Sequence, residues 1–194
     1  MTEKGKGSFG YLKKQAIRQG LFALGNVAIC AIIFLVGFFW LTEYSTIFTV
    51  MAVLGMLPAA KFIVSMILFM KAEKFTCPED IYKEALMITG DKKDELLCGF
   101  DFYLTSEKHN FPLCVVLVQK GVLIALTQDK KCDCNKAEEH IMEYMRKNSI
   151  SGITVKVFSE KSKFFDRFGQ LCNNDIQTTN NEMSAYHLIQ NLSL

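Results

Sequence analysis

The hydrophobic residues of the chain are concentrated in two long runs near its N-terminus. Residues 21–42 contain no charged side chain, and residues 47–70 contain Lys61 as their only charge. At about 1.5 Å per helical residue, each run reaches roughly 33 to 36 Å, which is enough to cross a hydrocarbon core of about 30 Å. Residues 43–46 form a short connection. The pattern therefore predicts two transmembrane helices joined as a hairpin.

The charges that flank the two runs predict how the hairpin is oriented. Residues 1–20 are basic, two lysines follow the second run, and residues 43–46 contain no lysine or arginine. By the positive-inside rule, both termini lie in the cytoplasm and residues 43–46 form an external loop. The first run is too long for a cleaved signal peptide, so we expect it to be retained. We take a bacterial inner membrane as the expected location of this multi-pass protein.

Residues 75–194 show shorter and more varied patterns. A helix is expected from about Pro78 to Thr89, followed by a strand over residues 96–105. Two short apolar runs, residues 113–118 and 122–127, are separated by Gln119-Lys120-Gly121, which is typical of a hairpin turn. Because these runs are almost wholly apolar, they suit strands that are buried on both faces.

The remaining elements are a helix, a strand and two more helices. We expect an amphipathic helix over residues 135–147, a strand over 153–158 and a helix capped by Ser159. After a polar linker over residues 173–181 comes a C-terminal helix. Met183, Tyr186 and Ile189 are expected to dock it on the domain. Capping boxes are predicted for three helices from the pairs Thr76 with Glu79, Asn135 with Glu138, and Thr179 with Glu182.

The order αβββαβαα predicts a small cytoplasmic α+β domain over residues 75–194. Its first six elements resemble the αβββαβ order of the restriction-endonuclease-like fold, and the resemblance is one of topology only. Those nucleases need an acidic residue near the second strand and an acidic-x-Lys motif on the third to hold a divalent metal. The third strand here lies in VLIALTQ, residues 122–128, and carries no carboxylate. The resemblance therefore implies a degenerate core that does not cleave nucleic acid.

Charge and cysteine content narrow the class of protein further. Residues 75–194 contain 14 Lys plus Arg and 17 Asp plus Glu, which gives a net charge near −3. A nucleic-acid-binding surface would need clustered basic residues, so no nucleic-acid partner is expected. Seven cysteines with irregular spacing, in a region expected to be cytoplasmic, indicate reduced thiols.

Few residues of the domain suggest chemistry. Cys132, Cys134 and His140 are weak candidates for a metal site, because thiolates and imidazole suit zinc or copper(I). A structural zinc site would need a second ligand pair nearby, so a reduced, solvated loop is the expected state. No phosphate-binding loop or nucleophile motif occurs, and we expect no cofactor and no catalytic residue.

Lys61 is the most unusual residue of the second run. One hypothesis is that its ammonium group snorkels towards the cytoplasm and finds local acceptors in Asn26 and Ser65. The alternative is that Lys61 faces a bundle interior or a water-filled path, as intramembrane charges often do.

Small and helix-breaking residues lie beside this lysine. Pro58 releases one main-chain carbonyl of the helix, and Gly55 and Ala59, four residues apart, allow another helix to approach closely. Self-association through the transmembrane helices is therefore expected.

These features lead to one functional hypothesis and two alternatives. The first is a membrane-anchored, non-enzymatic protein whose cytoplasmic domain binds a partner or small ligand as an oligomer. The alternative from another class is a pore-forming effector gated by ligand binding or oligomerisation. A membrane-tethered hydrolase or degenerate nuclease is the third.

Overall fold

The computed structural model describes residues 5–41, 47–90, 95–106, 109–173 and 178–194. They form helices α1 to α6 and a four-stranded mixed sheet, so the chain is α+β as predicted. The chain divides into two compact units, and the boundaries differ from those expected. Residues 12–73 form a helical unit, whereas the residues up to Tyr11 join residues 74–194 in an α+β unit.

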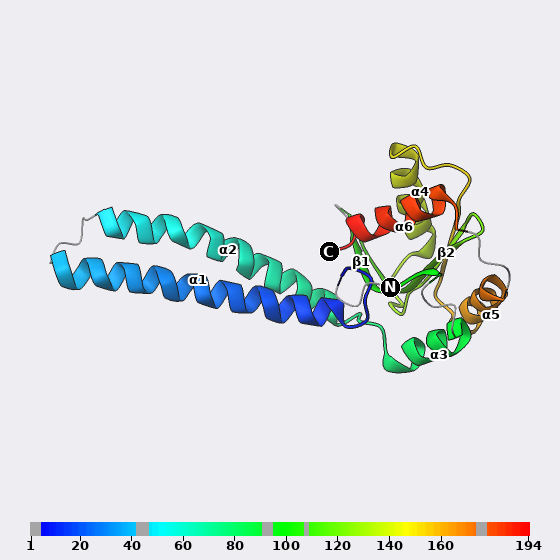
Figure 1. Ribbon diagram of the computed structural model, residues 1–194, viewed down its shortest axis with the longest axis horizontal. Helices are drawn as coiled ribbons and strands as arrows, with labels where there is room; N and C mark the ends of the chain where they lie inside the picture. Colours follow the sequence, from blue (N-terminus) through cyan, green and yellow to red (C-terminus); the bar gives the residue numbers. More distant parts are fainter. Residues whose placement is uncertain (1–4, 42–46, 91–94, 107–108, 174–177) are drawn as a thin grey trace. The chain divides into compact units, whose positions relative to one another are not determined.

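The helical unit consists of α1 (Tyr11–Leu41) and α2 (Ile47–Glu73), which lie side by side (Figure 1). They run antiparallel, since the ring of Phe22 lies 5.8 Å from that of Phe62 while Cys30 faces Gly55. Both helices are long and apolar enough to cross a membrane. The predicted loop over residues 43–46 falls outside the described residues. The helix α1 begins ten residues before the first apolar run.

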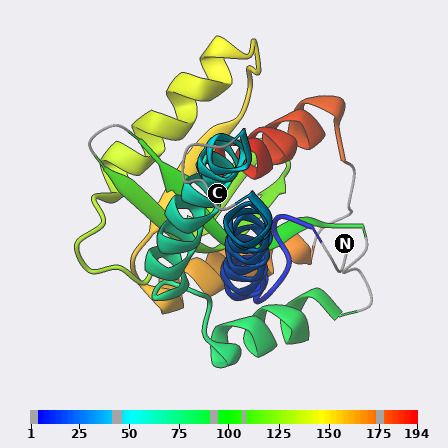
Figure 2. The same ribbon diagram turned by 90° about the vertical axis from the view of Figure 1, so that its left-hand side faces the viewer.

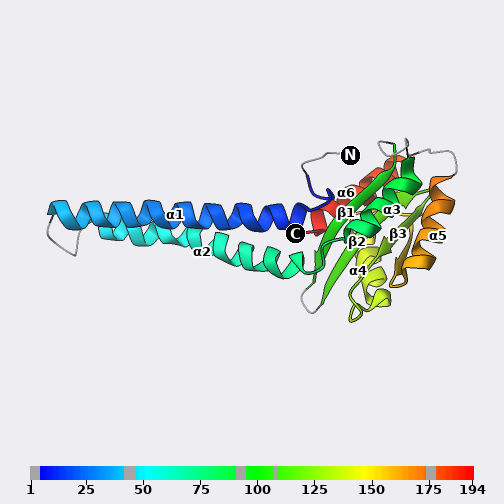
Figure 3. The same ribbon diagram turned by 90° about the horizontal axis from the view of Figure 1, so that it is seen from below.

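In the α+β unit, the strand order of the sheet is β1-β2-β3-β4 (Figure 3). Strands β1 to β3 form an antiparallel meander, and β4 runs parallel to β3. The strands are β1 (Leu97–Thr105), β2 (Asn110–Gln119), β3 (Val122–Leu126) and β4 (Thr154–Phe158).

Helices cover both faces of this sheet (Figure 2). The helices α3 and α5 pack on one face, and α4 and α6 on the other. Their bounds are α3 (Glu79–Thr89), α4 (Cys134–Lys147), α5 (Lys161–Cys172) and α6 (Asn180–Leu192). The observed order αβββαβαα is the predicted one. Element order alone does not establish a relation to the restriction-endonuclease-like fold.

The strand β2 is longer than predicted, because it starts at Asn110 and includes Pro112. Proline cannot donate a hydrogen bond to a neighbouring strand, which makes it rare inside sheets. Here β3 pairs with β2 only over Val115–Gln119, so no strand on that side needs an amide from Pro112. The structure therefore accommodates the proline where the sheet is only two strands wide.

Asp101 interrupts the regular alternation of β1. In a regular strand, residues two apart share a face. Yet Phe100 packs in the core under α3 and α5, and Phe102 packs in the core under α4 and α6. Asp101 between them has a left-handed backbone with φ of 57°, which is uncommon outside glycine. This conformation reverses the faces of the strand on either side of it.

One of the predicted capping boxes is present and two are not. At α6, the Thr179 side chain and the Glu182 side chain cap each other's main chain, as predicted. At α4, the cap is Asp133, whose carboxylate accepts from the amides of Asn135 and Lys136. An aspartate two residues earlier was an equally good acceptor, so the helix begins at Cys134 rather than at Asn135.

The caps predicted for α3 and α5 are also absent. At α3, Pro78 occupies the cap position without a side-chain hydrogen bond. The side-chain hydroxyl of Thr76 has no hydrogen-bond partner among the described residues. At α5, Glu160 precedes the first helical residue, so Ser159 lies one position too early to cap. Both helices are held instead by their buried apolar faces.

The docking of α6 follows a slightly different face from the predicted one. Glu182, Ala185 and Ile189 are buried, whereas Met183 is 45% exposed. Tyr186 is partly buried and packs on the same core. The prediction was therefore right for Tyr186 and Ile189 and wrong for Met183. Residues at intervals of three and four share a helix face, and the buried set keeps that spacing.

Candidate functional site

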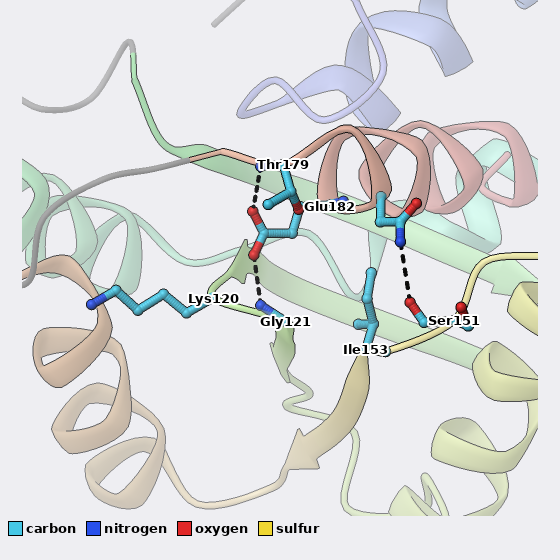
Figure 4. Close-up of a pocket in the computed structure, with 8 residues that line it drawn as sticks. Lys120, Gly121, Ser151, Ile153, Thr179 and Glu182 are labelled. Atoms are coloured by element: carbon cyan, nitrogen blue, oxygen red, sulfur yellow. Dashed lines mark hydrogen bonds between the residues drawn. The ribbon is translucent and has the colours of Figure 1, made fainter.

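A cavity of about 530 Å³ opens where the β2–β3 turn, the loop before β4 and the start of α6 meet (Figure 4). Its walls combine polar side chains with apolar surface, to which Ile153 contributes. The lining residues are Lys120, Gly121, Ser151, Gly152, Ile153, Thr179, Asn181 and Glu182.

Glu182 is the most buried charged group at this cavity, with 2% of its surface exposed. One carboxylate oxygen accepts from the amide of Gly121 at 2.6 Å, and the other accepts from the amide of Thr179 at 2.8 Å. No salt bridge reaches Glu182 within the described residues, and the Lys120 side chain extends away from it (Figure 4). Because both oxygens bind main chain, Glu182 fastens α6 to the β2–β3 turn and is not poised for acid–base chemistry.

The turn itself needs its glycine. The hairpin is present as predicted, but Gln119 pairs with Val122, so its turn has two residues instead of three. Lys120 and Gly121 have φ values of 52° and 68°, which is typical of a two-residue turn. A Cβ atom on Gly121 would lie 2.9 Å from the main-chain oxygen of Gly152. The sharp turn thus brings the Gly121 amide within reach of Glu182.

A second cavity of about 300 Å³ adjoins the first along α6. Asn181 lines both cavities, and its side-chain amide donates to the carbonyl of Ser151 at 3.4 Å. The second cavity is lined by Asn148, Ser149, Ile150, Asn181, Ser184, His187, Leu188 and Asn191. Amide and hydroxyl groups alternate with apolar surface along these cavities, which suits an uncharged ligand or a peptide.

Asp101 forms a separate buried centre at β1, with 1% of its surface exposed. Its carboxylate accepts from the amides of Gly10 and Tyr11, at the start of α1, and from the amide of Cys77 at 2.7 Å. Burial raises the pKa of Asp101 above its ordinary value, and these three hydrogen bonds oppose the shift. One side chain thus holds the segment before α1 and the segment after α2.

Cys77 lies next to this carboxylate, and its thiol contacts that of Cys114. A hydrogen bond with Cys114, followed by burial, raises the pKa of Cys77 above the ordinary value for a thiol. A protonated, buried thiol is a poor nucleophile and a poor metal ligand. Cys77 is therefore not an activated thiol, and both cysteines are buried in the core under α3 and α5.

A short segment before α1 bonds to β1 and to helix α6. We call residues 5–10 the N-terminal strap. The amide of Phe100 in β1 donates to the carbonyl of Gly7 at 2.8 Å, and the side chain of Gln190 in α6 donates to the carbonyl of Lys6 at 2.9 Å. The ring of Phe9 stacks on that of Tyr82 in α3 at 4.2 Å. The strap therefore contacts helices that cover opposite faces of the sheet.

The structure does not gather the weak metal candidates into a binding group. Among the described residues, no set of three His, Cys, Asp or Glu side chains could hold a metal ion. The ring of His140 packs against Phe111 and Tyr144, at 5.3 and 4.9 Å, and burial lowers its pKa. Burial also raises the pKa of the Cys132 thiol to about 11, which disfavours the thiolate that would bind metal. Cys134 begins α4 and is half-buried.

The predicted membrane residues occupy distinct positions in the helical unit. Lys61 is exposed on α2, and no hydrogen bond joins it to Asn26 or Ser65 within the described residues. Asn26 instead accepts a weak bond from the Cys30 thiol at 3.9 Å. Pro58 lies inside α2, which continues through it.

The small residues of α2 lie where α1 approaches. A Cβ atom on Gly55 would be 2.9 Å from the sulfur of Cys30, and Ala59 is buried. The close approach that Gly55 and Ala59 allow is thus used within the hairpin, between α1 and α2 of one chain.

The role of Asp101 as an acceptor of main-chain hydrogen bonds and the contacts of the N-terminal strap were not predicted from the sequence. An aspartate between two phenylalanines inside a strand is an unusual pattern, and it was the available sign that this position differs from its neighbours. Nothing in the spacing of Gly5, Gly7 and Gly10 indicates a partner strand. Glu182, by contrast, was predicted as a capping residue.

No family profile, curated protein or solved structure matches this chain.

Proposed function

We propose that this protein is anchored in a membrane by α1 and α2 and acts by binding, not by catalysis, through its α+β unit. The observation that carries the proposal is the hydrogen bonding of Asp101. Its carboxylate accepts hydrogen bonds from Gly10, which precedes α1, and from Cys77, which follows α2. The binding surface is the polar face of α6, where the two cavities adjoin. Its partner is a peptide or an uncharged small ligand that hydrogen-bonds to amides and hydroxyls.

The same contacts support a hairpin topology. Gly10 and Cys77 both bond to Asp101, so the segments before α1 and after α2 belong to one folded unit. A folded unit cannot be divided by a bilayer, because its main-chain hydrogen bonds would be lost in hydrocarbon. Together with the basic residues near both ends, this favours cytoplasmic termini in a cell membrane of the bacterial inner-membrane type.

A pore-forming effector is the alternative function, and the exposure of Lys61 favours it. A charged side chain on the outer surface of a hairpin is costly in lipid, unless it snorkels or faces water within an oligomer. Self-association of several hairpins around Lys61 would provide such a water-filled path. Leakage from liposomes separates this alternative from a simple anchor.

Cysteine labelling tests the topology. We expect Ser45→Cys to react with a membrane-impermeant maleimide in intact cells, because residues 43–46 would be external. Ser162→Cys, on the exposed surface of α5, should react only after the membrane is opened. The unmodified protein gives the background from its own cysteines. Labelling of Ser162→Cys from outside would overturn the proposed orientation.

Substitution of Lys61 tests its role. If the lysine snorkels, Lys61→Met should assemble at least as well as the wild type, because it removes a costly charge. Lys61→Glu should assemble less well, since a shorter anionic chain cannot reach the interface favourably. The measurement is the membrane-inserted fraction, with ion leakage from liposomes measured in parallel. Leakage by the wild type whose ion selectivity changes in Lys61→Glu would instead support the pore.

A further inference from the structure

The N-terminal strap fits its place too closely to be a loosely attached tail. A Cβ atom on Gly7 would lie 2.9 Å from the ring of Phe102 and 3.0 Å from the hydroxyl of Tyr186. Gly7 also has φ of 90°, which other residues rarely adopt. The strap is therefore built to lie between β1 and α6.

The buried carboxylate of Asp101 couples the main-chain segments that donate hydrogen bonds to it. Within the described residues no cation pairs with this buried carboxylate, so main-chain amides provide the polar contacts that oppose its desolvation. Two of the three amides, of Gly10 and Tyr11, come from the end of the strap and the start of α1. The third comes from Cys77. If either segment leaves, the carboxylate loses part of its coordination, and water must enter to replace it.

We infer that Asp101 is a clamp that holds or releases the strap and the segment after α2 as one unit. Through this clamp, the first residue of α1 and the segment after α2 are attached to β1 together. The inference rests on the proposed function, because it supplies the route by which binding in the α+β unit would reach the membrane helices. A movement of α6 bears on the same clamp, since Gln190 bonds to the strap.

The test of the clamp displaces the N-terminal strap by a substitution and measures amide hydrogen exchange in the segment after α2. Gly7→Ala should displace the strap through its clash with Phe102, without altering Asp101 or Cys77. We expect amide hydrogen exchange in the full-length chain, held in detergent micelles, to accelerate about tenfold in residues 5–12 and also in residues 74–80. Gly25→Ala in α1 is the matched control, because nothing lies within 4 Å of its added Cβ atom.

Asp101→Asn gives a second test that leaves the strap sequence unchanged. The amide side chain keeps one acceptor oxygen and presents a donor to the remaining main-chain amides, so both segments should exchange faster. Exchange in β3, residues 122–126, should stay near its wild-type rate. Asp166→Asn, at an exposed position of α5, is the control.

Three results would overturn the clamp. One is faster exchange in residues 5–12 with no change in residues 74–80. Another is no change in either segment. The third is an equal acceleration in β3, which would mean that Asp101 supports the whole fold and does not couple the two segments. None of these measurements uses membrane orientation or a ligand, so the topology experiment can succeed or fail independently.

Discussion

The α+β unit loses about 3 kcal/mol of unfolding free energy when the N-terminal strap is removed. This expected result compares residues 74–194 alone with a fusion in which residues 1–11 are joined to residue 74 by a short Gly-Ser linker. Without residues 1–11, the buried carboxylate of Asp101 loses the main-chain donors of Gly10 and Tyr11, and the ring of Tyr82 loses its stacking partner Phe9. Unsatisfied buried polar groups cost about 1–3 kcal/mol each, and an aromatic pair adds about 1 kcal/mol.

Chemical denaturation of the two proteins measures this difference. A fusion carrying Gly7→Ala serves as a control that keeps the chain length, and it should fall towards the stability of the shorter protein. Equal midpoints for residues 74–194 and the fusion would mean that the strap contributes no stability. The boundary of the folded unit would then lie after α2, as the sequence alone suggests.

The second large effect is expected at Glu182. Replacing this residue with alanine removes the carboxylate that accepts from the amides of Gly121 and Thr179, two hydrogen bonds that are partly buried. We expect the fusion protein to lose about 2–4 kcal/mol of unfolding free energy from two lost charge-assisted hydrogen bonds, one of which is the Glu182 half of the capping box.

Thermal or chemical unfolding of three fusion variants separates the contributions at Glu182. Glu139→Ala, at an exposed position of α4, should change the stability by less than about 0.5 kcal/mol. Thr179→Ala should cost about 1 kcal/mol, because it removes the hydroxyl cap and leaves Glu182 in place. A Glu182→Ala variant as stable as Glu139→Ala would show that α6 is not fastened to the β2–β3 turn by this carboxylate.

The sequence predicted the order of elements well because each element carries its own signal. Apolar runs such as residues 113–118 and 122–127 are dictated by burial on both faces, and the Lys120-Gly121 turn is dictated by backbone sterics. These are short-range properties. Helix starts were less predictable, because Asp133 and Asn135 are both good caps and only packing decides between them.

The long-range features were beyond such local arguments. The role of Asp101 depends on amides that are 91 and 24 residues away in the chain. A break in alternation at one residue of β1 cannot be inferred from spacing, because Phe100 and Phe102 look alike in sequence. The polar cavities were also missed, since the residues that line them come from three separate segments. Nothing in any one of those segments indicates a shared surface.

The contacts of the strap also constrain the order in which the chain can fold. Lys6 bonds to the carbonyl of Ser193, 187 residues further along, so the strap leaves the ribosome long before this partner exists. Closing so long a loop carries an entropic cost that grows with the logarithm of its length.

Insertion of α1 and α2 as a hairpin would shorten that loop, because it brings residue 11 and residue 74 together before β1 is made. The membrane would then act as a folding template for a domain that lies outside it. Chains that fail to insert would be synthesised with the edge of β1 uncovered, and an uncovered edge strand invites pairing with other chains. Aggregation of uninserted protein is the expected consequence in the cell.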